Sequence, residues 1–292
     1  MPTRTVNQGF TTFLSALTPS SGESTAAKNH RSSIKACLES NFSITSFFRT
    51  GSFGNGTSIS GHSDVDYFAE IPTCNLKTNS TTTLGEVRDA LKKRFPTTNV
   101  RVSCPAVVVP FGTDAKESTE VTPADYIETT EDDYRVYDIP NCSDGWMRSS
   151  PDAHNAYVRE VNGDLGYKVK PLIRFIKAWK YYQNVPISSF YLELRVTKYA
   201  EDKSSIVYAE DVKGVLSYLD SIDLRDMQDP MEISGYISPC STDTKLEDAK
   251  SKLSTALTRA KNACDAEDKG KTKEAFDWWN RLYNYNFPSY RY

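Results

Sequence analysis

Two aspartates separated by one residue form the part of the sequence best suited to chemistry. Asp64 and Asp66 flank Val65 in a run rich in β-branched and aromatic residues, which predicts a strand. Residues i and i+2 of a strand point to the same side, so we predict that both carboxylates share one face while Val65 packs on the other. Adjacent carboxylates repel unless a cation lies between them. Mg²⁺ prefers oxygen ligands and is commonly shared between carboxylates and substrate phosphates.

A turn rich in glycine and serine precedes this pair. It begins with Gly51-Ser52, directly after a predicted strand that ends at Arg49. Its backbone N–H groups and serine hydroxyl suit phosphate oxygens. A D-x-D pattern alone also fits a solvated strand edge or a turn cap, and a Gly-Ser turn alone is uninformative. Their order and spacing together predict a site for a metal ion and phosphates.

The elements that hold this site are predicted from residue periodicity. Residues 7–41 indicate helix with a break at 18–22, and residues 43–138 are mixed α/β. Helical spacing dominates after residue 151. We therefore predict an α+β protein with a catalytic lobe over 1–160 and a helical lobe over 161–292, and the N-terminal helix could cross to the second lobe. The predicted strands are 44–49, 65–71, 100–111 and 119–127; the predicted helices after residue 42 are 83–94, 152–162, 165–183, 187–202, 206–220, 243–265 and 271–283.

Charge and hydropathy narrow the classes of partner. The 292 residues carry 35 basic and 38 acidic side chains, a net charge of −3. Proteins that hold long nucleic-acid duplexes usually have a basic surplus, so we expect small-molecule substrates and no stable nucleic-acid binding. No apolar run approaches the ~20 residues of a membrane span, and the N-terminus lacks a secretory signal pattern. We expect a cytoplasmic protein that does not bind membranes.

Six cysteines are scattered through the sequence without a C-x-x-C pair. This pattern suggests neither a disulfide framework nor a zinc site, so we expect small buried side chains that stay reduced.

The pattern G-S-x(n)-G-T-x-I-x(n)-S-D-x-D resembles the signature of DNA polymerase β-like nucleotidyltransferases. The resemblance implies a polymerase β-like core, a mixed sheet with helices, followed by a helical lobe of the oligoadenylate synthetase and cGAS type. It also implies that Gly51 and Ser52 hold the phosphates of a donor NTP. Asp64 and Asp66 would bind two Mg²⁺ ions (Mn²⁺ is an alternative), and a third carboxylate on a neighbouring strand would complete the site.

A second segment resembles the strand that supplies this third carboxylate in cGAS-like and oligoadenylate-synthetase-like enzymes. Its pattern, an acid followed by two residues and then Pro-Ala, places Glu120 at the matching position. Relatives more often carry Asp there, so Asp125 and Glu117 are the alternatives.

Later segments are similar to bacterial cGAS/DncV-like enzymes, the CD-NTases of CBASS antiphage systems; these are residues 139–154, 170–179, 187–193 and 275–290. The resemblance implies that Lys177 and Ser189 hold the donor triphosphate, that Phe190 or Tyr191 stacks on a base, and that Asn141 reads a base edge. Each has a structural alternative: Lys177 extends along its helix to solvent, Ser189 caps a helix, the aromatic residue packs in the core, and Asn141 forms a turn.

The resemblance to this family implies an enzyme that condenses NTPs into a cyclic di- or trinucleotide, which would activate a downstream effector protein in antiphage signalling. One alternative is a nucleotidyltransferase with another acceptor: a linear oligonucleotide, an RNA tail, a protein or a small molecule. A second alternative is a catalytically weak nucleotide-binding sensor. The presence of Asp64 and Asp66 argues against the sensor.

Overall fold

The computed structural model describes residues 3–19, 21–62, 65–111 and 117–291. Within it the chain forms two compact units. The first, here called the sheet unit, contains Pro19–Ala156 and Met231–Gly235. The second, the helical unit, contains Met1–Thr18, Tyr157–Pro230 and Tyr236–Tyr292, so the N-terminal helix groups with the C-terminal part of the chain.

A mixed sheet organises the sheet unit. Its main path runs β1-β2-β5-β4-β3, where β2 and β5 are parallel and the other neighbours are antiparallel. Strands β6 and β7 extend from β5. The elements of this unit are α2 (Ser21–Phe42), β1 (Ser46–Arg49), α3 (Gly51–Asn55), β2 (Val65–Glu70), η1 (Thr73–Asn75), α4 (Ser80–Arg94), β3 (Arg101–Ser103), β4 (Ala106–Phe111), β5 (Glu117–Thr129), β6 (Arg135–Pro140), β7 (Trp146–Ser149) and the start of α5 (Pro151–Asp164).

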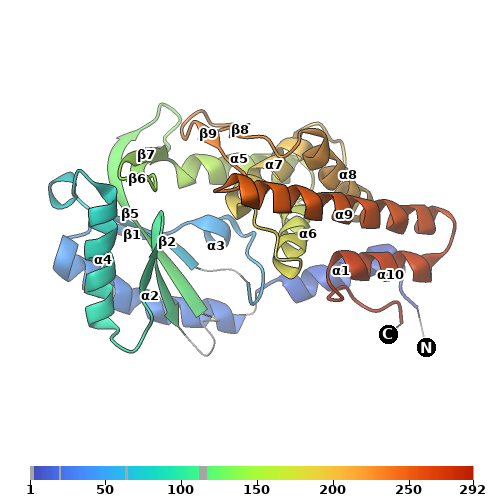
Figure 1. Ribbon diagram of the computed structural model, residues 1–292, viewed down its shortest axis with the longest axis horizontal. Coiled ribbons are helices and arrows are strands. Elements are labelled where there is room, and N and C mark those ends of the chain that lie inside the picture. The colour runs from blue at the N-terminus through green and yellow to red at the C-terminus, as the bar shows by residue number, and fades with distance from the viewer. Residues whose placement is uncertain (1–2, 20, 63–64, 112–116, 292) are drawn as a thin grey trace. The chain divides into compact units, whose positions relative to one another are not determined.

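Helices α2 and α4 cover one face of this sheet (Figure 1). Apolar side chains of both helices pack there against alternate residues of the strands, because successive strand residues point to opposite faces. Asn79 caps α4 by accepting a hydrogen bond from the Thr82 backbone N–H at 3.1 Å. A smaller apolar cluster occupies the other face and consists of Phe48, Phe68, Ala124, Tyr137 and Ile139.

The long strand β5 serves two parts of the sheet. Its first part pairs with β2 and β4, and its last part pairs with β6 through a register shift between Tyr126 and Glu128. A single strand therefore connects the main path to the β6–β7 extension.

A disulfide bond joins Cys104 and Cys142, so the expectation that all cysteines stay reduced is wrong. Cys104 lies in the turn between β3 and β4, and Cys142 follows β6. Both β4 and β6 pair with β5, which brings two cysteines 38 positions apart in sequence to a Cα–Cα distance of 5.6 Å. Cysteine spacing alone gave no sign of this pairing. Of the unpaired cysteines, Cys37 and Cys264 are buried as expected.

We expect the double variant Cys104→Ser, Cys142→Ser to unfold more readily than the oxidised protein. A bridge that closes a loop of this length lowers the entropy of the unfolded chain, and losing it should reduce the free energy of unfolding by ~2–4 kcal/mol. Urea denaturation measures the difference. Dithiothreitol should shift the midpoint of the parent protein and leave that of the variant unchanged; an unshifted parent would contradict the bridge.

The helical unit packs around aromatic side chains. Phe10 of α1 contacts the rings of Phe175, Trp279 and Phe287 with centroids 5.0–5.1 Å apart. Helix α1 begins at a capping box formed by Thr5 and Gln8. The elements of this unit are α1 (Val6–Leu17), the remainder of α5, α6 (Val169–Tyr182), α7 (Ser189–Glu201), α8 (Tyr208–Ser221), β8 (Met227–Gln228), β9 (Tyr236–Ile237), α9 (Asp243–Asp268) and α10 (Thr272–Leu282).

The predicted α+β class is confirmed, and every predicted helix is present within a few residues. The predicted strand over 100–111 is two strands with a turn between them, and β6–β9 were not predicted. None of the helices that the structure describes combines the length and apolar content that crossing a membrane requires.

Candidate active site

Strand β2 places Asp66 on the face of the sheet away from α2 and α4. Val65 and Tyr67 are buried in the core beneath those helices, so the alternation of the strand directs Asp66 to the opposite face. The prediction that Val65 packs in the core is confirmed.

Strand β5 places Glu120 directly beside Asp66. The two residues are partners in the parallel β2–β5 register, where neighbouring strands lie about 4.8 Å apart. Val121 is buried in the α2–α4 core, so Glu120 lies on the same face as Asp66. On its other side Glu120 pairs with Val108 of β4, which makes its strand central rather than an edge. The register thus brings together two of the three predicted carboxylates.

The two alternatives to Glu120 occupy other positions on β5. Asp125 is the register partner of Asp138 and accepts a hydrogen bond from Thr73 at 2.8 Å. Burial raises the pKa of Asp125, and the nearby Asp138 and Glu70 carboxylates add to this, whereas the Thr73 hydrogen bond lowers it. Glu117 lies opposite Phe111, three positions before Glu120. Neither is the register partner of Asp66.

Asp64 lies outside the described residues, so its predicted place on the Asp66 face stays a prediction. Within the part of the chain that the structure describes, no group of three His, Cys, Asp or Glu side chains could hold a metal. The predicted set of three metal-binding carboxylates needs Asp64 in addition to Asp66 and Glu120. The described pair fits a hard divalent cation in chemistry, since both ligands are carboxylates on one face of adjacent strands.

The Gly51-Ser52 turn packs directly onto Asp66. The Thr50 backbone N–H donates to the Asp66 carbonyl at 2.8 Å, and Gly51 follows with φ +56°. A Cβ atom at Gly51 would lie 1.9 Å from Asp66 Oδ2. The predicted turn is one turn of helix, α3, closed by hydrogen bonds from the Gly56 and Thr57 N–H groups to the Ser52 carbonyl. The two halves of the predicted motif therefore meet in space.

Comparison with known proteins identifies this arrangement. Residues 4–162 match the family model of the Second Messenger Oligonucleotide or Dinucleotide Synthetase domain, which is just over half of the chain. The chain belongs to this family. A probable cyclic nucleotide synthase of Bacillus cereus (strain VD146) is 29% identical over 168 residues, which cover 56% of this chain and half the length of that relative.

Solved CD-NTase structures share this fold. Escherichia coli MS115-1 CdnC with ATP superposes with a TM-score of 0.73 at 17% identity and covers 97% of this chain and 99% of that chain. Bradyrhizobium diazoefficiens CdnG in complex with GTP has a TM-score of 0.71 at 12% identity, and the match covers 95% of this chain and 98% of that chain. The Vibrio cholerae DncV cyclic AMP-GMP synthase has a TM-score of 0.65 at 16% identity, and the match covers 84% of this chain and 70% of that chain. The predicted CD-NTase fold is confirmed.

The helical unit of this family member holds Lys177 in a buried ion pair. Lys177 is 0% exposed, and its Nζ lies 3.1 Å from Oε1 of Glu193, which is 7% exposed. The alternative in which Lys177 extends along its helix to solvent is therefore wrong. Its predicted contact with a triphosphate stays a prediction.

We expect Lys177→Met to destabilise the protein by ~3–5 kcal/mol, because it breaks a buried ion pair by removing the ammonium group. The double variant Lys177→Met, Glu193→Leu should recover most of that loss, since a buried ion pair can be replaced by apolar side chains at little cost. Urea denaturation of both variants measures this. Equal stability of the parent and the single variant would contradict a structural role.

Ser189 is bonded to two residues of α6. Its Oγ accepts a hydrogen bond from Lys180 Nζ at 2.5 Å and lies 3.2 Å from the Tyr181 hydroxyl. The alternative that Ser189 caps α7 is wrong, because Ser188 is the cap and accepts from the Tyr191 N–H.

Two further basic residues of α6, Lys180 and Arg174, were not among the predicted site residues. They flank Lys177 at three-residue spacing on α6, a spacing that places side chains on neighbouring positions of one helix face. Burial lowers the pKa of Arg174, while the Glu193 carboxylate opposes that shift. The R-x-x-K-x-x-K pattern was the signal that could have identified this row.

Of the two aromatic candidates for base stacking, Phe190 is the exposed one at 39%, whereas Tyr191 is buried and its hydroxyl donates a hydrogen bond to the Arg225 carbonyl at 2.7 Å.

Asn141 accepts hydrogen bonds from the Ser143 and Gly145 N–H groups, as a turn residue does. Its role in reading a base stays a prediction.

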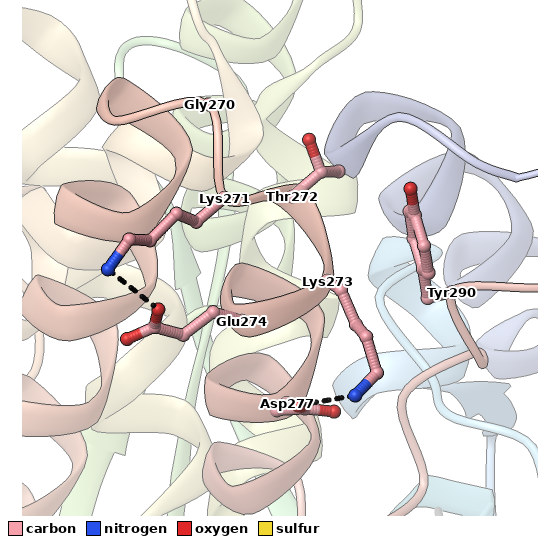
Figure 2. Close-up of a pocket in the computed structure, with 7 residues that line it drawn as sticks. All are labelled: Gly270, Lys271, Thr272, Lys273, Glu274, Asp277 and Tyr290. Atoms are coloured by element: carbon pink, nitrogen blue, oxygen red, sulfur yellow. Dashed lines mark ion pairs between the residues drawn. The ribbon is translucent and has the colours of Figure 1, made fainter.

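A cavity of about 400 Å³ lies at the α9–α10 connection of the helical unit (Figure 2). Its two lysines pair with acids of α10, Lys271 with Glu274 at 3.4 Å and Lys273 with Asp277 at 4.0 Å. None of the predicted site residues lines it. The lining consists of Gly270, Lys271, Thr272, Lys273, Glu274, Asp277 and Tyr290.

Proposed function

We propose that this protein is a metal-dependent nucleotidyltransferase that condenses NTPs into a cyclic di- or trinucleotide. The observation that carries the proposal is the pairing of Asp66 with Glu120 in the β2–β5 register, with Gly51 packed against Asp66. Membership of the synthetase family and the CD-NTase fold support the same reaction class.

In the proposed reaction a ribose hydroxyl of one NTP attacks the α-phosphorus of a second NTP. A new P–O bond forms, the bond to the departing pyrophosphate breaks, and the hydroxyl proton passes to solvent. Repetition on the linear product closes the ring. Two bound Mg²⁺ ions, for which Mn²⁺ can substitute, would stabilise the attacking and leaving oxygens.

The chain's own residues hold and orient the reactants. Asp66, Glu120 and Asp64 supply the carboxylates that bind the ions, and the Gly51-Ser52 turn holds the donor phosphates through its N–H groups and hydroxyl. Lys177 and Ser189 are proposed to contact the triphosphate, and Phe190 and Asn141 the bases. Positioning and electrostatic stabilisation contribute most of the rate in such a site.

The proposed product is a second messenger that activates a downstream effector protein in CBASS antiphage defence, and the proposed location is the cytoplasm. The ATP and GTP bound in the CdnC and CdnG structures support NTPs as substrates.

Incubation with all four NTPs and Mg²⁺ or Mn²⁺, followed by mass spectrometry of phosphatase-resistant products, tests this function. A cyclic product contains no terminal phosphate and survives phosphatase. Linear chains alone, or labelled protein alone, would contradict the cyclic-product proposal. Binding of NTPs without pyrophosphate release would favour a nucleotide-binding sensor.

A further inference from the structure

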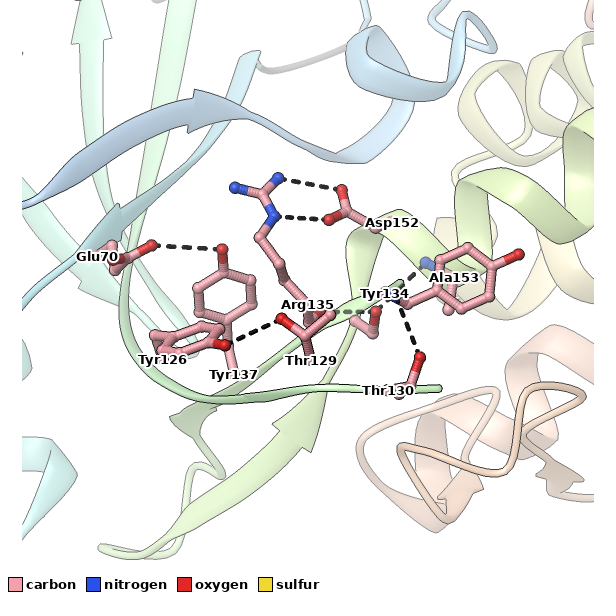
Figure 3. A network of polar contacts seen from close by, with 10 residues as sticks. Glu70, Tyr126, Thr129, Thr130, Tyr134, Arg135, Tyr137, Asp152 and Ala153 are labelled. Atoms are coloured by element: carbon pink, nitrogen blue, oxygen red, sulfur yellow. Dashed lines mark hydrogen bonds and ion pairs between the residues drawn. The ribbon is translucent and has the colours of Figure 1, made fainter. Parts of the chain in front are cut away.

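Arg135 of β6 holds the first turn of α5 by two independent contacts. Its Nε and Nη2 donate to both carboxylate oxygens of Asp152, at 2.8 and 3.3 Å (Figure 3). Its backbone carbonyl accepts a hydrogen bond from Ser150 Oγ at 2.8 Å, and the same Oγ accepts from the Ala153 N–H at 3.3 Å. One residue thus fixes both the start and the direction of the helix within the sheet unit.

The first turn of α5 approaches α3 at one residue, Asn155. Asp152 and Asn155 are three residues apart on α5, a spacing that places them on one side of the helix. Asn155 Nδ2 lies 4.0 Å from the position of a Cβ atom at Gly54. Gly54 lies in the same helical turn as Ser52, and its N–H donates to the Thr50 carbonyl at 3.0 Å. Asn155 is thus the α5 residue that faces the helical turn of Gly51 and Ser52 at Gly54.

Arg135 also contacts the strand that enters this turn. Its guanidinium lies 4.8 Å from the centroid of the Phe48 ring, and Phe48 is three residues before Gly51 on β1. Planar stacking of this kind needs the flat guanidinium of arginine and is weaker for a lysine ammonium. The segment before the turn and the helix behind it are both held by one side chain.

We propose that Arg135 is a positioning residue that sets the Gly51-Ser52 turn for the donor triphosphate, acting through Asp152 and Asn155. This inference rests on the proposed function. Its side chain and that of Asp152 are 40% and 32% exposed, and an ion pair so open to water adds little to stability. The bidentate geometry is therefore more useful for orienting α5 than for holding the fold together.

The test compares Arg135→Lys and Asn155→Ala with a matched control, Arg148→Lys. Arg148 pairs with Asp138 at 3.3 Å on the same β6–β7 extension with exposures of 44% and 29%, and it has no described bond to α5. We expect Arg135→Lys and Asn155→Ala each to raise the KM for ATP about tenfold with kcat changed far less, because a displaced turn weakens phosphate binding in ground and transition states alike. Arg148→Lys should leave KM unchanged.

The double variant Arg135→Lys, Asn155→Ala should raise KM by less than the product of the two single effects, since both changes disturb the approach of α5 to the Gly51-Ser52 turn. Unchanged KM in Arg135→Lys, fully multiplying effects in the double variant, or an equal rise in Arg148→Lys would overturn the inference. ATP binding measured by calorimetry accompanies the kinetics. If the parent protein forms no product at all, the proposed function fails, and equal ATP affinity of parent and Arg135→Lys would then overturn the positioning role separately.

Discussion

We expect Glu120→Gln to reduce nucleotide joining about a thousandfold, corresponding to ~4 kcal/mol of lost transition-state stabilisation. The substitution keeps the size of the side chain and removes the negative charge that, beside Asp66, attracts a divalent cation. Glu120→Asp keeps a carboxylate at the same strand position, so it should retain part of the activity. Pyrophosphate release from NTPs in Mg²⁺ measures all of these variants.

The matched control is Asp125→Asn. Asp125 lies on the same strand and was an alternative candidate. Its register partner, however, is Asp138, and its carboxylate accepts a hydrogen bond from Thr73. We expect its activity to stay within a fewfold of the parent protein. Full activity in Glu120→Gln together with loss of activity in Asp125→Asn would assign the role of third carboxylate to Asp125 instead. The melting temperature of each variant shows whether a loss of activity comes from unfolding.

The sequence was most informative where local alternation decides the structure. Val65 and Asp66 point to opposite faces because a strand alternates, so the side of the carboxylate followed from the pattern alone. The pairing of Asp66 with Glu120 did not follow from any pattern. It depends on the register of two parallel strands that are more than fifty residues apart in sequence, and only the resemblance to a family suggested it.

Features that depend on long-range approach were missed. Strand β6 follows an acidic turn and ends at Pro140, so its local composition gave a weak strand signal. The Cys104–Cys142 bridge depends on β4 and β6 sharing β5. Lys177 is the third case. The structural alternative for Lys177 was a side chain that extends along its helix to solvent, because its carboxylate partner lies on a different helix and is not visible in the local sequence. Pairing with Glu193 allows full burial of the charge.

Gly51→Ala is the substitution from which we expect the second large loss, at least about a hundredfold in activity. Two separate effects operate at this position. A φ of +56° strains any residue with a Cβ by ~1–2 kcal/mol. In addition, the new Cβ would lie 1.9 Å from Oδ2, 2.5 Å from Cγ and 2.9 Å from Cβ of Asp66. Rotation of the Asp66 side chain cannot relieve the last of these contacts, so β2 or the turn must move.

Gly61→Ala separates the two effects. Gly61 has φ +73°, and a Cβ there meets nothing within 4 Å, so this variant carries the backbone strain without the collision. Thermal unfolding should show a small destabilisation in Gly61→Ala and a larger one in Gly51→Ala, because only Gly51→Ala adds the collision with Asp66 to the backbone strain. Pyrophosphate release should fall steeply only in Gly51→Ala. Equal activities would mean that the Gly51 turn does not have to touch Asp66. A steep loss confined to Gly51→Ala would show that the phosphate turn and the metal-binding strand act as one unit, because the glycine is what lets them meet.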